Sequence, residues 1–387
     1  MSELLILLLP LAAFSGWWLA RNDNKNTDGH KEDDYFKGLS YLLEDETDKA
    51  IDIFFRIAHL DDSTIENQIT LGNLFRHRGE IDRALHIHTH LQNKAGNNDD
   101  IQQKLNLALA DDYLAAGIMN HAETHYQLVR QATQPDMREA ARRKLIILYA
   151  EQSQWLQAIE IAEELDPFRH DALIQQQVAH YHCETATIAL EDNNNSGAEQ
   201  ALKTALQCDS HCVRATIKLG RLAAKQQHYV MAINHFTQVE KQHVAFLPEI
   251  LDDLADCYAA LNQQHEWKDL LRHYVKCYYN PVLMLRFSHL IAETEGINAA
   301  REFLQQYLQE KPTILAVQAF VKLIDDKQNK SIHLINQSIQ RVLGYTLKYR
   351  CCECGFRGNQ LNWQCPGCKN WGTFTPVSDV SLKENIR

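Results

Sequence analysis

The feature that most constrains this fold is a pattern of small and aromatic residues that returns after 34 positions. Gly38, Tyr41, Ala50 and Phe54 are followed at that interval by Gly72, Phe75, Ala84 and His88. Small residues in two antiparallel helices let their backbones approach closely, and larger side chains fill the space beside them. The pattern therefore predicts helix pairs that stack along the chain.

Looser copies extend the pattern toward the C-terminus. Successive second helices are marked, at intervals of 34 to 40 residues, by Ala84, Ala122, Ala158, Ala198 and Ala232, and a weaker copy by Ala300. Helix–turn–helix units with a period near 34 residues are the tetratricopeptide pattern. We predict an all-α tetratricopeptide-repeat solenoid over residues 35–345, with about eight or nine units between residues 35 and 320. We expect its repeat positions to pack rather than to bind ligands.

Composition agrees with helices and argues against a nucleic-acid partner. Only 15 glycines and 8 prolines occur among 387 residues, of which 45% are hydrophobic, so turn signals are widely spaced and a core can form. The formal net charge is −11 at pH 7, whereas binding to a phosphate backbone requires clusters of Lys and Arg. We expect a folded, helical protein with no nucleic-acid partner.

The N-terminus carries an apolar segment, LLILLLPLAAFSGWWLA, at residues 4–20. Its length is at the short end of what a helix needs to cross about 30 Å of hydrocarbon. Trp17 and Trp18 suit the headgroup region, and Arg21 and Lys25 follow on the side that should be cytoplasmic. We predict a transmembrane anchor at residues 1–20 and a polar tether at 21–34. A cleaved signal peptide is the alternative, although no basic residue precedes the apolar stretch.

The repeats contain several other residues that are candidates for binding. A solenoid binds partners on its concave face, where the candidates are Asn73, Arg76, Arg78 and Arg83 in GNLFRHRGEIDRA. A solvated, charged turn is the simpler interpretation of this stretch. His86 and His90 lie four apart, but no carboxylate or cysteine completes a metal site with them.

Ten cysteines fall into two groups. Five of them are scattered through helical sequence, and we interpret these as small core residues in a reducing compartment: Cys183, Cys208, Cys212, Cys257 and Cys277. Cys208 and Cys212 lie four apart, but a loop separates them, and we treat this pair as structural too. The other five are concentrated in residues 351–368.

The second group forms two C-x2-C turns within YRCCECGFRGNQLNWQCPGCKNWGTF, residues 349–374. Two such turns can supply the tetrahedral four-sulfur shell that suits zinc or iron. We predict one metal ion held by Cys351, Cys354, Cys365 and Cys368, with Cys352 outside the shell. The ion should supply most of the stability of this short domain, on the order of 10 kcal/mol. A disulfide cluster or free thiols are the alternatives.

The surroundings of these turns favour a structural metal. Tyr349, Phe356, Trp363 and Trp371 can shield so small a site, and a shell of four thiolates leaves no open position for chemistry. No catalytic motif appears elsewhere in the chain, so we expect no enzymatic activity.

Three segments together resemble a known family over essentially the whole chain. They are the leader ELLILLLPLAAFSGWWLAR, the repeats LGNLFRHRGEIDRAL and DDYLAAGIMNHAE, and the closing CCECGF and WQCPGCKNW. In that order they resemble lipopolysaccharide assembly protein B of Gram-negative bacteria. The resemblance implies a rubredoxin-like metal-binding domain at residues 346–376, packed against the repeats and followed by a tail at 377–387.

The same resemblance implies a function. It is that of a single-pass inner-membrane adaptor whose bulk lies on the cytoplasmic side and which regulates lipopolysaccharide biosynthesis. The adaptor would bring an LpxC-type deacetylase to a membrane-bound ATP-dependent protease of the FtsH type, and other lipopolysaccharide assembly proteins are further candidate partners. A passive scaffold for envelope synthesis or transport is the first alternative, and a redox carrier the second. The short loop between the turns, and Lys369 where a glycine is usual, both weaken the electron-transfer alternative.

Overall fold

The computed structural model describes residues 65–96, 98–165, 171–324, 330–344 and 347–377, together with a few positions between 36 and 53. The chain divides into two compact units, Met1–Gln152 and Ser153–Arg387, a division that the repeat pattern does not indicate. The predicted anchor and tether lie outside the described residues. Among the helices that are described, none is long and apolar enough to cross a membrane.

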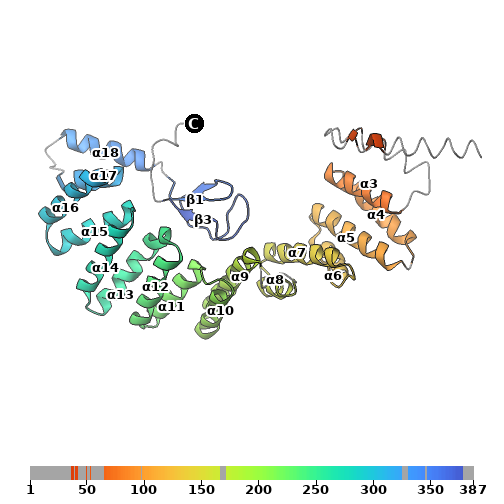
Figure 1. Ribbon diagram of the computed structural model, residues 1–387, viewed down its shortest axis with the longest axis horizontal. Helices are drawn as coiled ribbons and strands as arrows, with labels where there is room; N and C mark the ends of the chain where they lie inside the picture. Colours follow the sequence, from red (N-terminus) through yellow and green to blue (C-terminus); the bar gives the residue numbers. More distant parts are fainter. Residues whose placement is uncertain are drawn as a thin grey trace, which may run out of the picture. The chain divides into compact units, whose positions relative to one another are not determined.

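From residue 65 onward, the first unit has five helices that follow one another as antiparallel neighbours (Figure 1). They are α3 (Ile65–His77), α4 (Ile81–Lys94), α5 (Asp99–Ala115), α6 (Met119–Val129) and α7 (Pro135–Glu151). Within this unit α3 pairs with α4 and α5 with α6, and α3, α5 and α7 contact one another in sequence. These contacts are those of stacked helix–turn–helix units.

The second unit contains further helices and a small sheet (Figure 1). Its helices are α8 (Trp155–Glu163), α9 (Ala172–Glu191), α10 (Asn195–Cys208), α11 (Val213–Lys225), α12 (Tyr229–Gln242), the 3-10 helix η1 (Val244–Ile250), α13 (Leu251–Ala260), α14 (Gln264–Cys277), α15 (Pro281–Thr294), α16 (Ile297–Glu310), α17 (Ile314–Ile324) and α18 (Lys330–Gly344). The strands are β1 (Tyr349–Cys351), β2 (Arg357–Gly358) and β3 (Phe374–Pro376). The predicted helical array with a small C-terminal domain is therefore confirmed, and the strands are an addition to it.

A left-handed residue closes the turn inside most helix pairs. Residues with positive φ in these turns include Gly79, Gly117, Asn193, Gln227, Asn262 and Gly296. In the first five turns the next N–H donates to the carbonyl five residues earlier, as from Glu80 to Phe75 at 2.9 Å. This geometry satisfies the free carbonyls at the end of the first helix and sends the chain back along it.

Small residues face large ones across each helix pair, as the repeat predicts. A Cβ added to Gly72 would lie 2.3 Å from the His88 ring, and one added to Gly220 would lie 2.5 Å from Phe236. The marker alanines at positions 84, 122, 158, 198, 232 and 300 are all fully buried. Their predicted packing role is confirmed. At the corresponding place after the Asn262 turn the chain has Trp267, which is also buried and which no sequence pattern marked.

Candidate metal centre and concave groove

The two C-x2-C turns have the same backbone geometry. In the first, the N–H of Cys351 donates to the Phe356 carbonyl at 2.8 Å, and the Cys351 carbonyl accepts from Gly355 at 3.1 Å. In the second, Cys365 repeats both bonds with residues 370 and 369, each at 2.9 Å. The fifth residue of each turn is left-handed, with φ of 75° at Gly355 and 62° at Lys369. Lys369 therefore occupies a position where a glycine would be unstrained.

A small antiparallel sheet, in the order β2-β1-β3, presents the two turns to each other. The four sulfur atoms all lie within 4.8 Å of one another. Cys351 Sγ is 3.7 Å from Cys368 Sγ, and Cys354 Sγ is 3.6 Å from Cys365 Sγ. Zinc–sulfur bonds of about 2.3 Å in a tetrahedron place sulfur atoms about 3.8 Å apart. The structure thus brings the four predicted ligands together in a set that fits a tetrahedral cation.

Local hydrogen bonds favour the thiolate at one corner of this cluster. Burial tends to raise the pKa of Cys351, but the Thr373 hydroxyl and the N–H groups of Cys354 and Glu353 outweigh it and lower the pKa to about 6. The Cys351 Sγ to Thr373 Oγ1 distance is 3.3 Å. Burial instead raises the pKa of Cys365 to about 11. A bound dication would favour the thiolate at every corner, because metal ligation requires the deprotonated sulfur.

The residues around the cluster differ partly from those expected to shield it. Cys352 is exposed and lies outside the set of four, as predicted. Tyr349 and Phe374 are buried behind the sulfurs, whereas Phe356 is 41% exposed and shields the site poorly. Trp363 and Trp371 face the helices instead of the sulfurs, so their main role is to dock the domain.

Trp371 packs into an aromatic site made by α8 and α9. Its ring stacks on His180 at 5.4 Å and meets Tyr181 and Trp155 edge-on at 5.9 and 6.0 Å between centroids. The Arg214 guanidinium, from α11, lies 5.9 Å from the same ring and bonds Glu184 at 2.9 Å. A cation above an aromatic face and away from water stabilises such a contact by about 2 kcal/mol.

A second docking site involves η1, the short helix before α13. Trp363 stacks on Phe246 with centroids 5.4 Å apart and an interplanar angle of 15°. The Tyr349 hydroxyl donates to Glu249 Oε1 at 2.7 Å. Trp363 and Leu361 also pack against the main hydrophobic core of this unit, which runs from α11 to α17. The metal-binding domain and the array therefore share one core, and the packing implied by the resemblance is present.

His180 is the most perturbed titratable group at this interface. It is 3% exposed, and burial together with the nearby Arg214 charge lowers its pKa to about 3. The imidazole therefore stays neutral at physiological pH and packs as an aromatic ring. No repeat motif or metal-ligand spacing in the sequence indicates His180. The contacts that bury it come from Trp371 and Arg214, which are distant in sequence and reach it only when the metal-binding domain is docked.

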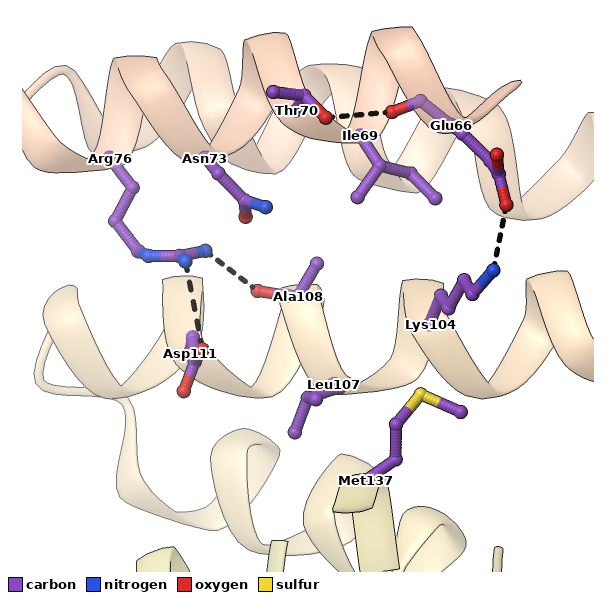
Figure 2. Close-up of a pocket in the computed structure, with 10 residues that line it drawn as sticks. All are labelled: Glu66, Ile69, Thr70, Asn73, Arg76, Lys104, Leu107, Ala108, Asp111 and Met137. Atoms are coloured by element: carbon purple, nitrogen blue, oxygen red, sulfur yellow. Dashed lines mark hydrogen bonds and ion pairs between the residues drawn. The ribbon is translucent and has the colours of Figure 1, made fainter. Parts of the chain in front are cut away.

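The first unit holds a groove of about 350 Å³ on α3, α5 and the start of α7 (Figure 2). Its apolar lining comes from Ile69, Leu107, Ala108 and Met137. Two of the four residues proposed from sequence as concave-face candidates, Asn73 and Arg76, line it as well. The other two, Arg78 and Arg83, pair with Glu80 at the surface turn, which agrees with the simpler interpretation of that stretch.

The charges of this groove are paired with one another. Lys104 Nζ lies 2.7 Å from Glu66 and 3.0 Å from Asp100. Arg76 bonds Asp112 at 2.7 Å and lies 3.6 Å from Asp111, as Figure 2 shows in part. Because each cation already faces an acid, the groove does not favour an anion. Apolar side chains beside paired charges suit a protein surface better.

Behind the groove lies a buried polar network that sequence analysis missed. His88 is fully buried, with Nδ1 2.5 Å from Asp112 Oδ2 and Nε2 3.1 Å from the Ile69 carbonyl. Both ring nitrogens therefore face oxygen atoms that can accept a hydrogen bond. The neighbouring His86 and His90, which were weighed as a metal pair, are both exposed. The only signal for His88 was its repeat position, which predicts burial but not the Asp112 partner.

The fold and the cysteine cluster define a helical-repeat protein with a docked four-cysteine metal-binding domain. A family model described as a rubredoxin metal binding domain matches residues 349–376. Lipopolysaccharide assembly protein B of Escherichia coli (strain K12) is 32% identical over 389 residues, covering 97% of this chain and 98% of that protein. The Haemophilus influenzae (strain ATCC 51907 / DSM 11121 / KW20 / Rd) protein of the same name is 33% identical, covering 98% and 99%. The chain belongs to the lipopolysaccharide assembly protein B family.

Among solved structures, the tetratricopeptide-repeat domain of P58(IPK) is similar to 81% of this chain and 98% of its own, at 14% identity and a TM-score of 0.24. A structural similarity with so low a TM-score is not evidence for the fold. The assignment of the fold depends on the helix pairs of this structure. The predicted family is confirmed by the two curated relatives, whose similarity includes both the array and the metal-binding domain.

Proposed function

We propose that this protein is a non-enzymatic adaptor of the inner membrane that regulates lipopolysaccharide biosynthesis. It would present an LpxC-type deacetylase to a membrane-bound ATP-dependent protease of the FtsH type and so lower the deacetylase level. The strongest support for this proposal is the 32% sequence identity, over 97% of the chain, to a protein named for lipopolysaccharide assembly. The route through regulated proteolysis follows from the family resemblance stated above.

The architecture has features that an adaptor needs. A helical array offers extended surface, and the groove on α3, α5 and α7 is one part of it that suits a protein partner. The metal-binding domain is held against a different part of the array by Trp363 and Trp371. In this proposal the groove of the first unit and the metal-binding domain of the second unit would each contact one partner. An anchor at residues 1–20 would raise the effective concentration of the adaptor near a membrane protease, so that weak contacts suffice.

The metal has a structural role in this proposal. Zinc or iron would be held by Cys351, Cys354, Cys365 and Cys368, and would link β1 to the second C-x2-C turn. The chain's own contribution is to dock the resulting domain through Tyr349, which bonds Glu249. An adaptor of this kind needs no catalytic group.

The test is the lifetime of the deacetylase. In cells depleted of this protein we expect the LpxC-type deacetylase to become several-fold more stable after synthesis is blocked, and its level to rise. Complementation with the full chain should restore turnover. Unchanged deacetylase turnover, despite complete depletion, would rule out the adaptor mechanism.

A passive scaffold is the second candidate, because a name that refers to assembly suits a scaffold equally well. In-cell crosslinking separates the two. An adaptor should be recovered with the protease and the deacetylase, whereas a scaffold should be recovered with transport or synthesis proteins and no protease.

A further inference from the structure

Two cysteines of the array, outside the metal centre, lie in direct contact. Cys183 is in the middle of α9 and Cys212 is the N-cap residue of α11, and their sulfur atoms are 3.9 Å apart. Cys183 is fully buried and Cys212 is 3% exposed. All ten cysteines of the chain are free thiols in this structure. A disulfide has an S–S length of about 2 Å, so the two sulfur atoms must move closer together before a bond can form.

Two cations lie close to this pair, although Glu184 pairs with Arg214 and the Asp209 carboxylate lies beside Cys212. Arg214 follows Cys212 by two residues and is 6% exposed. Lys218, one turn further along α11, donates to the Thr187 hydroxyl at 2.7 Å, and that hydroxyl donates to the Cys183 carbonyl at 2.8 Å. Cys212 also lies at a helix N-terminus, where the helix dipole favours negative charge. Nearby cations and a helix N-terminus favour the thiolate form of a cysteine, whereas burial opposes it.

The two thiols are not equivalent. Burial raises the pKa of Cys183 well above its usual value. The hydrogen bond with Cys183 outweighs burial at Cys212 and lowers its pKa. The position of Cys212 at the N-terminus of α11 therefore favours a thiolate there more than at Cys183.

We propose that Cys183 and Cys212 form a redox-active thiol pair that a hydroperoxide converts into a reversible intramolecular disulfide. The Cys212 thiolate attacks the terminal oxygen of the peroxide, the O–O bond breaks, and the other oxygen leaves with the proton that the Cys212 thiol gave up, as an alcohol or, from hydrogen peroxide, as water. Cys212 becomes a sulfenic acid. The Cys183 sulfur then displaces the sulfenic oxygen, losing its proton, and water leaves as the S–S bond forms. Two electrons pass from the two sulfurs to the peroxide, and a dithiol reductant reverses the reaction.

The position of the pair gives the bond a structural consequence. It would join α9 to α11 covalently, and these two helices supply His180 and Arg214 to the Trp371 docking site. Oxidation would therefore act on the platform that holds the metal-binding domain. Neither the sulfurs nor the reaction overlaps with the four-cysteine centre, so this inference does not depend on the proposed adaptor function.

The experiment uses the purified full chain in detergent, loaded with zinc. The protein is treated with hydrogen peroxide under native conditions, alkylated, and digested without reductant. We expect a peptide pair joined through Cys183 and Cys212, formed on the order of ten-fold faster than any oxidation of Cys257. Cys257 is the internal control, since it is equally buried and none of the other nine cysteines contacts it in the structure. The zinc content is measured in the same samples.

Two variants complete the test. In Cys183→Ser the sulfenic acid of Cys212 has no resolving thiol, so a dimedone adduct should accumulate there. In Cys212→Ser, Cys183 should stay reduced. Recovery of both thiols unmodified at peroxide doses that oxidise the exposed Cys277 would overturn the proposal and leave the pair as core packing. A disulfide that forms mainly between Cys208 and Cys212 would overturn it as well.

Discussion

At Gly220 the array has no room for a methyl group, because the Phe236 ring occupies the space that a Cβ would need. Gly220→Ala should lower the free energy of unfolding by roughly 1–3 kcal/mol, the usual cost of overpacking a core. In the preceding helix pair the corresponding positions are Ala186 and Leu202, both fully buried. The double variant Gly220→Ala/Phe236→Leu copies that pair and should recover much of the loss. Urea denaturation measures the free energy of unfolding of the single and the double variant. A double variant that is less stable than the single one would contradict this account of the packing.

His180 makes the stability of the second unit depend on pH. Its pKa is lowered to about 3 in the folded protein, whereas an unfolded histidine titrates near pH 6.5. The unfolded state therefore binds the extra proton first. The contribution of His180 is complete above pH 6.5 and is lost as the pH falls from there toward 3. We expect the free energy of unfolding to fall by up to about 1.4 kcal/mol for each pH unit below 6.5.

The measurement compares the wild-type protein with His180→Gln in urea at pH 7.5, 6.5 and 5.5, with zinc content followed at each pH. The variant lacks this titration, so its stability should fall less steeply. Other histidines, such as the half-buried His182, and the metal-binding cysteines remain in both proteins and do not affect the difference. If the free energy of unfolding changes equally with pH in both proteins, His180 does not control the pH dependence of stability.

At the scale of elements, the metal-binding domain has two short turns and three strands but little core of its own. Removing the metal should disorder residues 349–376 and uncover the surfaces on α9 and η1 that Trp371 and Trp363 occupy. Hydrogen exchange should accelerate in those two segments and remain unchanged in α3 to α6.

Single cysteine variants give the matched control for metal removal. Cys354→Ser removes one of the four clustered sulfurs and should release the metal, with the same exchange pattern as chelation. Cys352→Ser changes an exposed neighbour outside the cluster and should retain the metal. Retention of a full metal equivalent by Cys354→Ser would show that the four-sulfur assignment is wrong.

At the scale of the whole molecule, the proposed function requires the protein to be confined to the membrane. A protein that lacks residues 1–21 should fold, because the buried core in the described residues begins well after that segment. It should nevertheless fail to restore deacetylase turnover in depleted cells, since the effective concentration near the protease is lost. Replacing the segment with an unrelated transmembrane helix should restore turnover. Normal turnover with the truncated protein would show that tethering is unnecessary.

Local chemistry made much of this protein predictable. The 34-residue recurrence indicated helix pairs, because only small residues permit backbones to approach at Ala84 or Ala232, and both are fully buried. The two C-x2-C turns predicted a four-sulfur cluster, because the turn itself directs both thiols to one side. These features depend on residues close in sequence, and so a repeat or a spacing reveals them.

Long-range contacts were decided only by the tertiary structure. The bonds from Arg76 and His88 to Asp112, the stack of Trp371 on His180, and the Cys183–Cys212 contact all join different helices or domains. The sequence around a buried side chain does not indicate whether that side chain will contact an apolar residue, a charged residue or a second thiol. The sequence by itself therefore determined the helical array and the metal-ligand set, whereas the partners across each interface depend on how the elements pack. Burial energy selects an approximate arrangement, but the identity of each neighbour follows from three-dimensional geometry that no local pattern encodes.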